Sequence, residues 1–260
     1  LTLEPLASSE AVLSQDEKDA GVVLVDIGGG TTDVAIFYQN IIRHTAVIPL
    51  GGNIITQDIR EGCSVLFDQA EALKVRFGSA ITHDSMANEV VSIPGLRGRD
   101  PKEISLLTLA HIINARVKEI IQHVQYEIRS SGYEKRLSAG IVLTGGGARL
   151  KSIKHLFSLM TGMEVCIGDS NGHLGQAPDA IKSPVYATVC GLVLTSLAMK
   201  DKDEKQSQSQ VTNTSKPVQI KEEEEAVEPQ REGLLNRLLS ALPGMFIDPE
   251  LGTQNRPNRG

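Results

Sequence analysis

The sequence of 260 residues predicts an α/β fold. Two short runs, Gly21–Ile27 and Gly140–Gly147, begin with almost unbroken apolar, β-branched residues, as expected of strands covered on both faces. Each of these runs leads into three consecutive glycines. Lys102–Arg129 places its apolar residues at helical spacing over many turns. Buried strands, tight glycine turns and a long amphipathic helix together indicate a sheet packed against helices.

The first part of the chain predicts one helix and three strands. Leu3–Leu13 has the pattern of a short helix, and Gln15–Asp19 that of a polar turn. The strand Gly21–Ile27 is followed by two further strands, Val34–Tyr38 and Ile41–Leu50, with tight turns between them. We expect these three strands to form a meander at one side of the sheet.

The middle of the chain predicts mainly helices, of which Lys102–Arg129 is the longest. The uncharged stretch Ser183–Met199 is shorter than the ~20 residues of a membrane-spanning helix, so it predicts a buried helix. The other predicted elements are helices at Asn53–Glu61, Phe67–Phe77 and Leu150–Met160 and strands at Glu89–Ile93 and Glu164–Ile167.

Composition argues against several classes of protein. The net charge of −6, the aromatic content of 3% and the absence of Trp disfavour a nucleic-acid binder. The three cysteines show no zinc-ligand spacing, which favours a reducing, cytoplasmic setting. The chain begins with Leu1 and shows no secretory signal, so we expect a piece of a longer protein. It has neither a Walker P-loop nor a Rossmann fingerprint.

The first motif with chemical content is DIGGGTTD, at residues 26–33 between two predicted strands. Glycines allow backbone N–H groups to approach phosphate oxygens closely. Asp26, at the end of a strand, is suited to hold Mg²⁺ through water. The alternative is a glycine-rich hairpin turn, but the flanking Asp26 and the TTD segment favour phosphate binding.

The second motif is IVLTGGGA, at residues 141–148, where a strand runs into glycines and then into a helix. That arrangement suits a close approach of the backbone to a ribose or a phosphate. One strand–glycine–helix unit is weak evidence by itself. Two glycine loops, each after a buried strand, are a much stronger indication of a nucleotide site.

DIGGGTTD and LTGGGARL resemble the second phosphate motif and the adenosine motif of the actin-like ATPase superfamily. Within it, the segments LEPLASSEAVL, IIRHTAVIPLGGNIITQDI, EALKVRFG and YATVCGLVL resemble the FtsA family of bacterial cell-division proteins, over about residues 1–200. The resemblance implies the second half of an actin-like (ribonuclease H-like) fold. The first phosphate motif would then lie upstream of Leu1.

The resemblance also implies a domain organisation. Residues 1–20 would connect to the missing first half, 21–52 and 138–200 would form the actin-like core subdomain, and 53–137 would form a smaller inserted α/β lobe. Residues 201–232 are rich in Lys, Glu, Gln and Ser and predict a disordered acidic linker. Residues 233–246 would be an amphipathic membrane-targeting helix and 247–260 a polar tail.

The roles implied for single residues centre on Mg·ATP. Asp26 would sit near the Mg²⁺, and Glu4 would help to position water and metal. Gly28, Gly29, Gly30 and Thr31 would meet the β- and γ-phosphates, and Gly145, Gly146 and Gly147 would pass the ribose and α-phosphate. Glu71 and Lys74 would contact the nucleoside. The alternatives are a simple helix start at Glu4 and an exposed intrahelical ion pair for Glu71 and Lys74.

A leucine stripe marks the predicted C-terminal helix, because its apolar residues recur on one helical face. An interfacial membrane helix fits this pattern, and a helix for a protein partner is the alternative. The residues expected in the membrane are Leu234, Leu235, Leu238, Leu239, Leu242 and Phe246.

The resemblance implies an ATP-binding protein that self-assembles into polymers and tethers the FtsZ ring to lipids of the inner membrane. The FtsZ C-terminal peptide would dock on the lobe at 53–137, other division proteins would be further partners, and the location would be the cytoplasmic face at the division site. Hydrolysis of ATP would be slow or incidental. A sugar kinase, a chaperone ATPase or a pilus-assembly protein on the same fold are the alternatives.

Overall fold

The computed structural model describes residues 2–95, 100–170 and 181–211, with the side chains of 202–211 excepted. Contacts within the chain separate two units, Leu1–Thr214 and Ser215–Gly260, and every described residue belongs to the first. The predicted helix at 233–246, with its leucine stripe, and the tail at 247–260 lie outside the described residues. Within the described part, no helix is long and apolar enough to cross a membrane.

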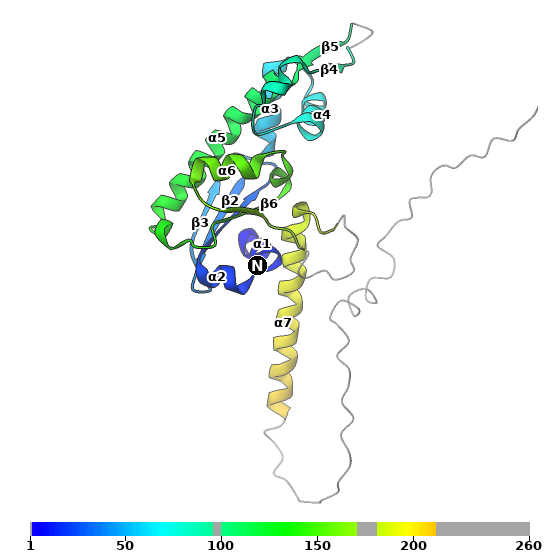
Figure 1. Ribbon diagram of the computed structural model, residues 1–260. Helices are drawn as coiled ribbons and strands as arrows, with labels where there is room; N and C mark the ends of the chain where they lie inside the picture. The colour runs from blue at the N-terminus through cyan, green and yellow to red at the C-terminus, as the bar shows by residue number, and fades with distance from the viewer. Residues whose placement is uncertain (1, 96–99, 171–180, 212–260) are drawn as a thin grey trace, which may run out of the picture. The chain divides into compact units, whose positions relative to one another are not determined.

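The centre of the described unit is a five-stranded sheet in the order β3-β2-β1-β6-β7 (Figure 1). The predicted meander is confirmed, because β1 pairs antiparallel with β2 and β2 antiparallel with β3. On its other side β1 pairs in parallel with β6, and β6 with β7. The strands are β1 (Val22–Ile27), β2 (Thr32–Tyr38), β3 (Ile41–Ile48), β6 (Ile141–Thr144) and β7 (Val165–Ile167).

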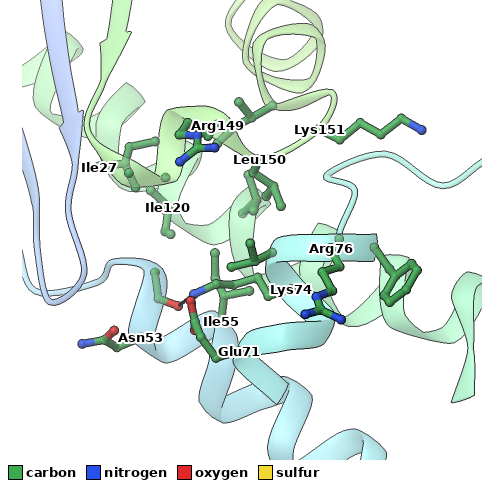
Figure 2. Close-up of a pocket in the computed structure, with 18 of the residues that line it drawn as sticks. Ile27, Asn53, Ile55, Glu71, Lys74, Arg76, Ile120, Arg149, Leu150 and Lys151 are labelled. Carbon is green, nitrogen blue, oxygen red and sulfur yellow. Dashed lines mark hydrogen bonds and ion pairs between the residues drawn. The ribbon is translucent and has the colours of Figure 1, made fainter. Parts of the chain in front are cut away.

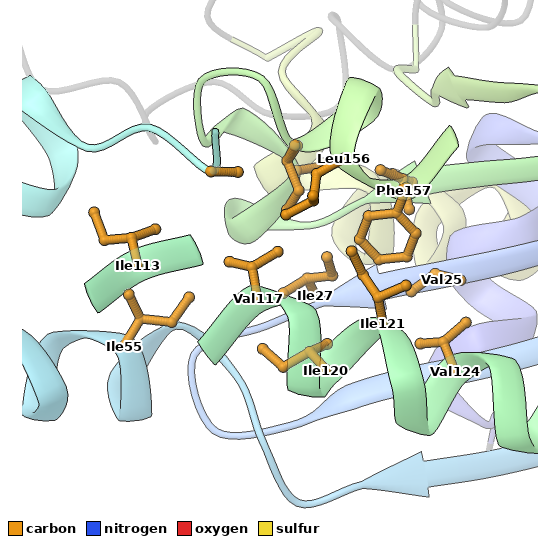
Figure 3. Close-up of a cluster of buried hydrophobic side chains, with 14 of the residues drawn as sticks. Val25, Ile27, Ile55, Ile113, Val117, Ile120, Ile121, Val124, Leu156 and Phe157 are labelled. Atoms are coloured by element: carbon orange, nitrogen blue, oxygen red, sulfur yellow. The ribbon is translucent and has the colours of Figure 1, made fainter. Parts of the chain in front are cut away.

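One face of this sheet packs against the helices α5 (Leu106–Ser130) and α6 (Ile153–Thr161). Side chains that alternate along β1, such as Val25 and Ile27, join Ile121 of α5 and Phe157 of α6 in the larger hydrophobic core (Figure 3). Every residue of β1 is buried, as expected of a strand covered on both faces.

The opposite face of the sheet packs against helices from the two ends of the described unit. Val22 and Leu24 of β1 form a smaller core there with Leu13 and with Leu6 of α1. α1 itself lies against α7. The helices of this layer are α1 (Glu4–Val12), α2 (Gln15–Ala20) and α7 (Ala187–Val211).

A smaller lobe is built around the first half of α5 (Figure 1). It contains α3 (Gly52–Cys63), α4 (Phe67–Phe77), the short 3₁₀ helix η1 (Asp84–Asn88) and a hairpin of β4 (Val90–Ile93) and β5 (Lys102–Ser105). Ile55 of α3 and Ile113 of α5 belong to the same core as the main sheet. The lobe and the sheet therefore share one continuous hydrophobic interior.

Three predicted elements differ from the structure in type or bounds, and the helix predicted to be buried at Ser183–Met199 instead exposes Val189 and Met199 on α7. Gln15–Ala20 is a helix, not a turn, because Ser14 and Glu17 form a capping box at its start. Lys102–Ser105 is the strand β5, since it pairs with β4, and the long helix begins only at Leu106. α7 continues to Val211, past position 201 where the linker was expected to begin.

Candidate functional site

A cavity of 610 Å³ opens where the carboxyl end of β1 meets the smaller lobe. Ligands in α/β folds bind at this end of the strands. The cavity brings together six of the residues predicted to bind nucleotide. They are Gly28 and Gly29 of the first glycine loop, Gly146 and Gly147 of the second, and Glu71 and Lys74 of α4.

The first glycine loop is held in place by the start of α3. Gly28 N–H donates to Thr31 O at 2.9 Å and so closes the turn. The carbonyls of Gly28 and Gly29 accept hydrogen bonds from Gly52 N at 2.9 Å and Asn53 N at 2.8 Å. These bonds use N–H groups that the first turn of a helix cannot satisfy internally.

Gly51 makes that close approach possible, although sequence reasoning did not single it out. A Cβ at Gly51 would lie 2.7 Å from Gly29 O and 2.8 Å from Gly28 O, closer than packed atoms come. The only sequence signal is the Gly51-Gly52 pair directly after the third predicted strand. Glycine there serves the packing of two backbones against each other.

Asp26 lies behind the second loop and does not line the cavity. It is buried opposite Asp33 and Thr144 in the sheet, and it accepts a hydrogen bond from Ser8 Oγ at 2.7 Å. Burial raises the pKa of Asp26, the bond from Ser8 lowers it, and the charge of Asp33 raises it further, with a net upward shift.

Glu4 is exposed near the same carboxylates. Burial raises the pKa of Glu4, and the charges of Asp33 and Asp26 raise it further. The described residues contain no group of three acidic, His or Cys side chains close enough to hold a metal ion directly. A cation would relieve the mutual repulsion of these carboxylates, and their arrangement fits a hydrated Mg²⁺ held through its waters better than a direct protein cage.

The three glycines of the second loop differ from one another in what surrounds them. Gly145 has a φ of +81°, and a Cβ there would collide with the Asp26 carboxylate. A Cβ at Gly147 would collide with the side chain of Ile27. A Cβ at Gly146 would meet no atom within 4 Å, and this residue faces the cavity.

Glu71 and Lys74 form the predicted i, i+3 pair, with Lys74 Nζ 2.7 Å from Glu71 Oε2. Lys74 is largely buried, with 14% of its side chain exposed, so the pair is not a simple surface ion pair. Burial raises the pKa of Glu71, but the hydrogen bonds from Lys74 and Thr56 and the charge of Lys74 outweigh it and hold this pKa below its ordinary value.

Three cationic side chains at the cavity, those of Arg76, Arg149 and Lys151, escaped sequence reasoning. Arg149 lines one wall, and Glu71 with Lys74 lies across from it (Figure 2). Arg76 of α4 also lines the cavity. Neither arginine makes an ion pair within the described ranges, so both are free to meet an anionic ligand. The ARL of LTGGGARL was the only available signal for Arg149.

Four other predicted residues do not line the cavity: Gly30, Thr31, Gly145 and Glu4. Thr31 Oγ1 donates to Asp33 Oδ2 at 3.0 Å, so this hydroxyl ties the first loop to β2. Gly145 lets the second loop pass close to Asp26, because a Cβ there would collide with the Asp26 carboxylate.

Solved structures with the same fold are actin-like. MreB5 of Spiroplasma citri bound to ADP superposes with a TM-score of 0.64 at 20% identity, over 78% of this chain and 61% of that chain. The PilM–PilN type IV pilus biogenesis complex gives a TM-score of 0.55 at 18% identity, over 75% of this chain and 52% of that one. The predicted actin-like fold is therefore confirmed.

Sequence comparison narrows the assignment. "Cell division protein FtsA" of Pseudomonas aeruginosa is 41% identical over 197 residues, 76% of this chain and 47% of that protein. The Escherichia coli K12 protein of the same description is 38% identical over 195 residues, 72% of this chain and 46% of that protein. The chain spans about half the length of these relatives. The model of the family described as cell division protein FtsA matches residues 23–191, and the chain belongs to this FtsA family.

Proposed function

We propose that this chain forms the second half of a Mg·ATP clamp in a division protein that links the FtsZ ring to the inner membrane. The observation that carries the nucleotide part is the cavity of 610 Å³, which is lined by both glycine loops and by α4. ATP acts mainly as a ligand that sets the shape of the subunit, and its hydrolysis is slow.

Each wall of the cavity has a distinct task in this proposal. Gly28 and Gly29 offer backbone to the β- and γ-phosphates, and Gly146 and Gly147 offer it to the ribose and α-phosphate. Arg149 supplies positive charge to the phosphates, since its guanidinium is unpaired within the described ranges. Asp26 and Asp33, which do not line the cavity themselves, would hold Mg²⁺ through its waters, and the ion would neutralise phosphate charge.

The test is calorimetric titration of Mg·ATP into the full-length protein, in which the N-terminal half precedes this chain. Gly146→Val is the sharpest variant, because Gly146 lines the cavity and a Cβ there would meet no described atom within 4 Å. We expect the affinity to fall by at least about tenfold, with the unfolding temperature unchanged. Equal affinities of variant and parent contradict the assignment of this loop.

The partner half of the proposal rests on membership of the FtsA family. The FtsZ C-terminal peptide docks on the lobe at 53–137, and further division proteins and other copies of this protein bind the assembled subunit. An NMR titration with that peptide tests the docking surface. Shifts confined to resonances outside 53–137 contradict it.

The membrane half rests on the leucine stripe at 233–246. Residues such as Leu235 and Leu239 bury apolar surface in the interface, and each leucine contributes roughly 1.5–3 kcal/mol. The double variant Leu235→Glu, Leu239→Glu should release the protein from anionic liposomes in a co-sedimentation assay. Deletion of 247–260 is the control and should leave binding intact. Unchanged co-sedimentation of the double variant removes the membrane role.

A further inference from the structure

Thr56 stands at the centre of a polar network beneath the cavity. It lies in α3, is completely buried and does not itself line the cavity. Its Oγ1 is 2.7 Å from Lys74 Nζ, 2.5 Å from Glu71 Oε2 and 3.1 Å from Gly52 O. This buried hydroxyl is satisfied only while its three polar neighbours on α3 and α4 stay in place.

The hydrogen bonds of this network can be assigned by counting donors. Lys74 has three N–H donors, and its three acceptors are Gly52 O, Thr56 Oγ1 and Glu71 Oε2. Thr56 receives one of these and has a single hydrogen of its own to give. The shorter distance assigns that hydrogen to Glu71 Oε2, at 2.5 Å against 3.1 Å for Gly52 O.

The assignment leaves each side chain with a defined role. Lys74 has no donor left for a ligand, so its ammonium serves as a fixed tie. Glu71 uses only Oε2 inside the network, and Oε1 makes no hydrogen bond within the described residues. The Glu71 side chain is 42% exposed at the cavity, so Oε1 is the acceptor that the network presents to a ligand.

The same network reaches the first glycine loop through one residue. Gly52 accepts from Lys74 with its carbonyl, at 2.9 Å, and donates its own N–H to Gly28 O, at 2.9 Å. Gly52 thus joins the first glycine loop to the side chain of Lys74. Within the described ranges, Thr56 is the only residue of α3 whose side chain is hydrogen-bonded to both Glu71 and Lys74.

We propose that Thr56 is a positioning residue of the nucleotide site, whose hydroxyl holds Glu71 and Lys74 against Gly52 and so sets the spacing between the nucleoside end and the phosphate end. The proposal rests on the proposed function, since it assumes that the cavity takes ATP. Without the hydroxyl, Lys74 has a donor with no partner, and Glu71 loses one of the two contacts that orient it. The Glu71 carboxylate is then no longer held in place before the ligand binds. Binding has to order it, and this cost lowers the affinity for the ligand.

The experiment compares Thr56→Val, which keeps the shape and removes the hydroxyl, with Thr56→Ser, which keeps the hydroxyl. Both are made in the full-length protein and titrated with Mg·ATP. We expect Thr56→Val to bind about tenfold more weakly, the size expected for a lost hydrogen bond to a charged group, and Thr56→Ser to stay within about threefold of the parent.

Thr195→Val is the matched control. Thr195 is also a helical threonine whose hydroxyl donates to the carbonyl four residues earlier, Gly191 O, at 2.8 Å. It lies on α7 and does not line the cavity. Its nucleotide affinity should equal that of the parent, and a loss equal to that of Thr56→Val overturns the proposal.

A background without the Glu71 carboxylate separates positioning from plain stability. In Glu71→Ala, adding Thr56→Val should weaken Mg·ATP binding by less than about threefold, because the group to be positioned is gone. A full tenfold loss in that background overturns the proposal. If Thr56→Val does not fold, Thr56→Ser and Thr56→Ala replace it, and equal affinities of these two overturn the proposal.

The outcomes also separate the inference from the proposed function. If the parent protein binds no Mg·ATP, both the proposed nucleotide function and the inference about Thr56 are wrong. A parent that binds, together with a Thr56→Val variant of equal affinity, ends only the inference about Thr56.

Discussion

The two glycine loops each contain three consecutive glycines, but the glycines have different roles in the two loops. In the first loop, at residues 28–30, no Cβ would come closer than 3.3 Å to a described atom outside its immediate neighbours. In the second loop, Gly145 and Gly147 are already required by the protein itself, through Asp26 and Ile27, and only Gly146 is open.

The difference separates two reasons for glycine. Where the protein's own atoms fill the place of a Cβ, glycine serves the fold, and substitution lowers stability. Where that place is empty and faces the cavity, glycine serves a ligand, and substitution lowers affinity. Glycine substitutions test this difference, beginning with the variant that should lower stability most.

Gly145→Ala should cause the largest loss of stability. Its φ of +81° is strained for alanine, and the new methyl collides with the buried Asp26 carboxylate. We expect the free energy of unfolding to fall by about 3 kcal/mol, from strain and overpacking together. Urea denaturation measures it, with Gly146→Ala as the neighbour that should change little. Similar losses in the two variants would break the division.

Gly147→Ala should cost less, about 1–2 kcal/mol, because Gly147 does not have the positive φ of Gly145, so overpacking against Ile27 acts without backbone strain. The matched experiment adds Ile27→Ala, which removes Cγ2, the atom nearest to the new methyl, and keeps Cβ. If overpacking against Ile27 is the cause, Gly147→Ala should lower the free energy of unfolding less in the Ile27→Ala background than in the parent. An additive loss in urea denaturation would point to the backbone instead.

Gly29→Ala should leave the free energy of unfolding within about 0.5 kcal/mol of the parent, since the new methyl would come no closer than 3.4 Å to the Asn53 side chain, an ordinary packing distance. In the full-length protein it should nonetheless weaken Mg·ATP binding, because Gly29 lines the cavity. Thermal unfolding and calorimetry on the same samples test both halves. Lost stability with unchanged affinity reverses the interpretation of this loop.

Asp26→Asn should give the smallest change, and in the stabilising direction. A carboxyl whose pKa is raised by folding binds its proton more tightly in the folded state. Stability therefore falls as pH rises from the unfolded pKa, about 3.9, through the folded pKa, and the penalty persists above it. The variant should be more stable than the parent at pH 7, and its advantage should shrink toward pH 4. Urea midpoints at the two pH values decide; a less stable variant at pH 7 contradicts the burial argument.

Local patterns predicted most of the sheet and both loops. The strands β1 and β6 were found because an apolar run that ends in glycines is a signal contained within about eight residues. The strand β5 was missed because Ile104 also fits the helical spacing of the residues after it. Lys102–Ser105 is a strand only because it pairs with β4, and this pairing depends on tertiary structure that the local sequence does not reveal.

The sequence predicted the glycines of the candidate site but not the residues that hold or surround them. Gly51, Arg149 and Thr56 matter because of what folding brings next to them. Thr56 is 15 residues from Glu71 and 18 from Lys74 along the chain, so no spacing rule connects them. Sequence reasoning found groups that carry their own chemistry and overlooked groups whose role is to hold others.

The helix α5 has a mechanical consequence. Its first half lies in the core of the lobe, its second half lies on the sheet, and Glu127 near its end is 2.9 Å from His44 Nε2 of the edge strand β3. At 1.5 Å per residue, this rod of 25 residues is about 37 Å long. A tilt of ~5° around its lobe end would sweep the other end by ~3 Å, several times the amplitude of an ordinary atomic vibration. If the cavity closes around a ligand and tilts α5 as a rigid helix, the movement would displace β3 at the distant edge of the sheet.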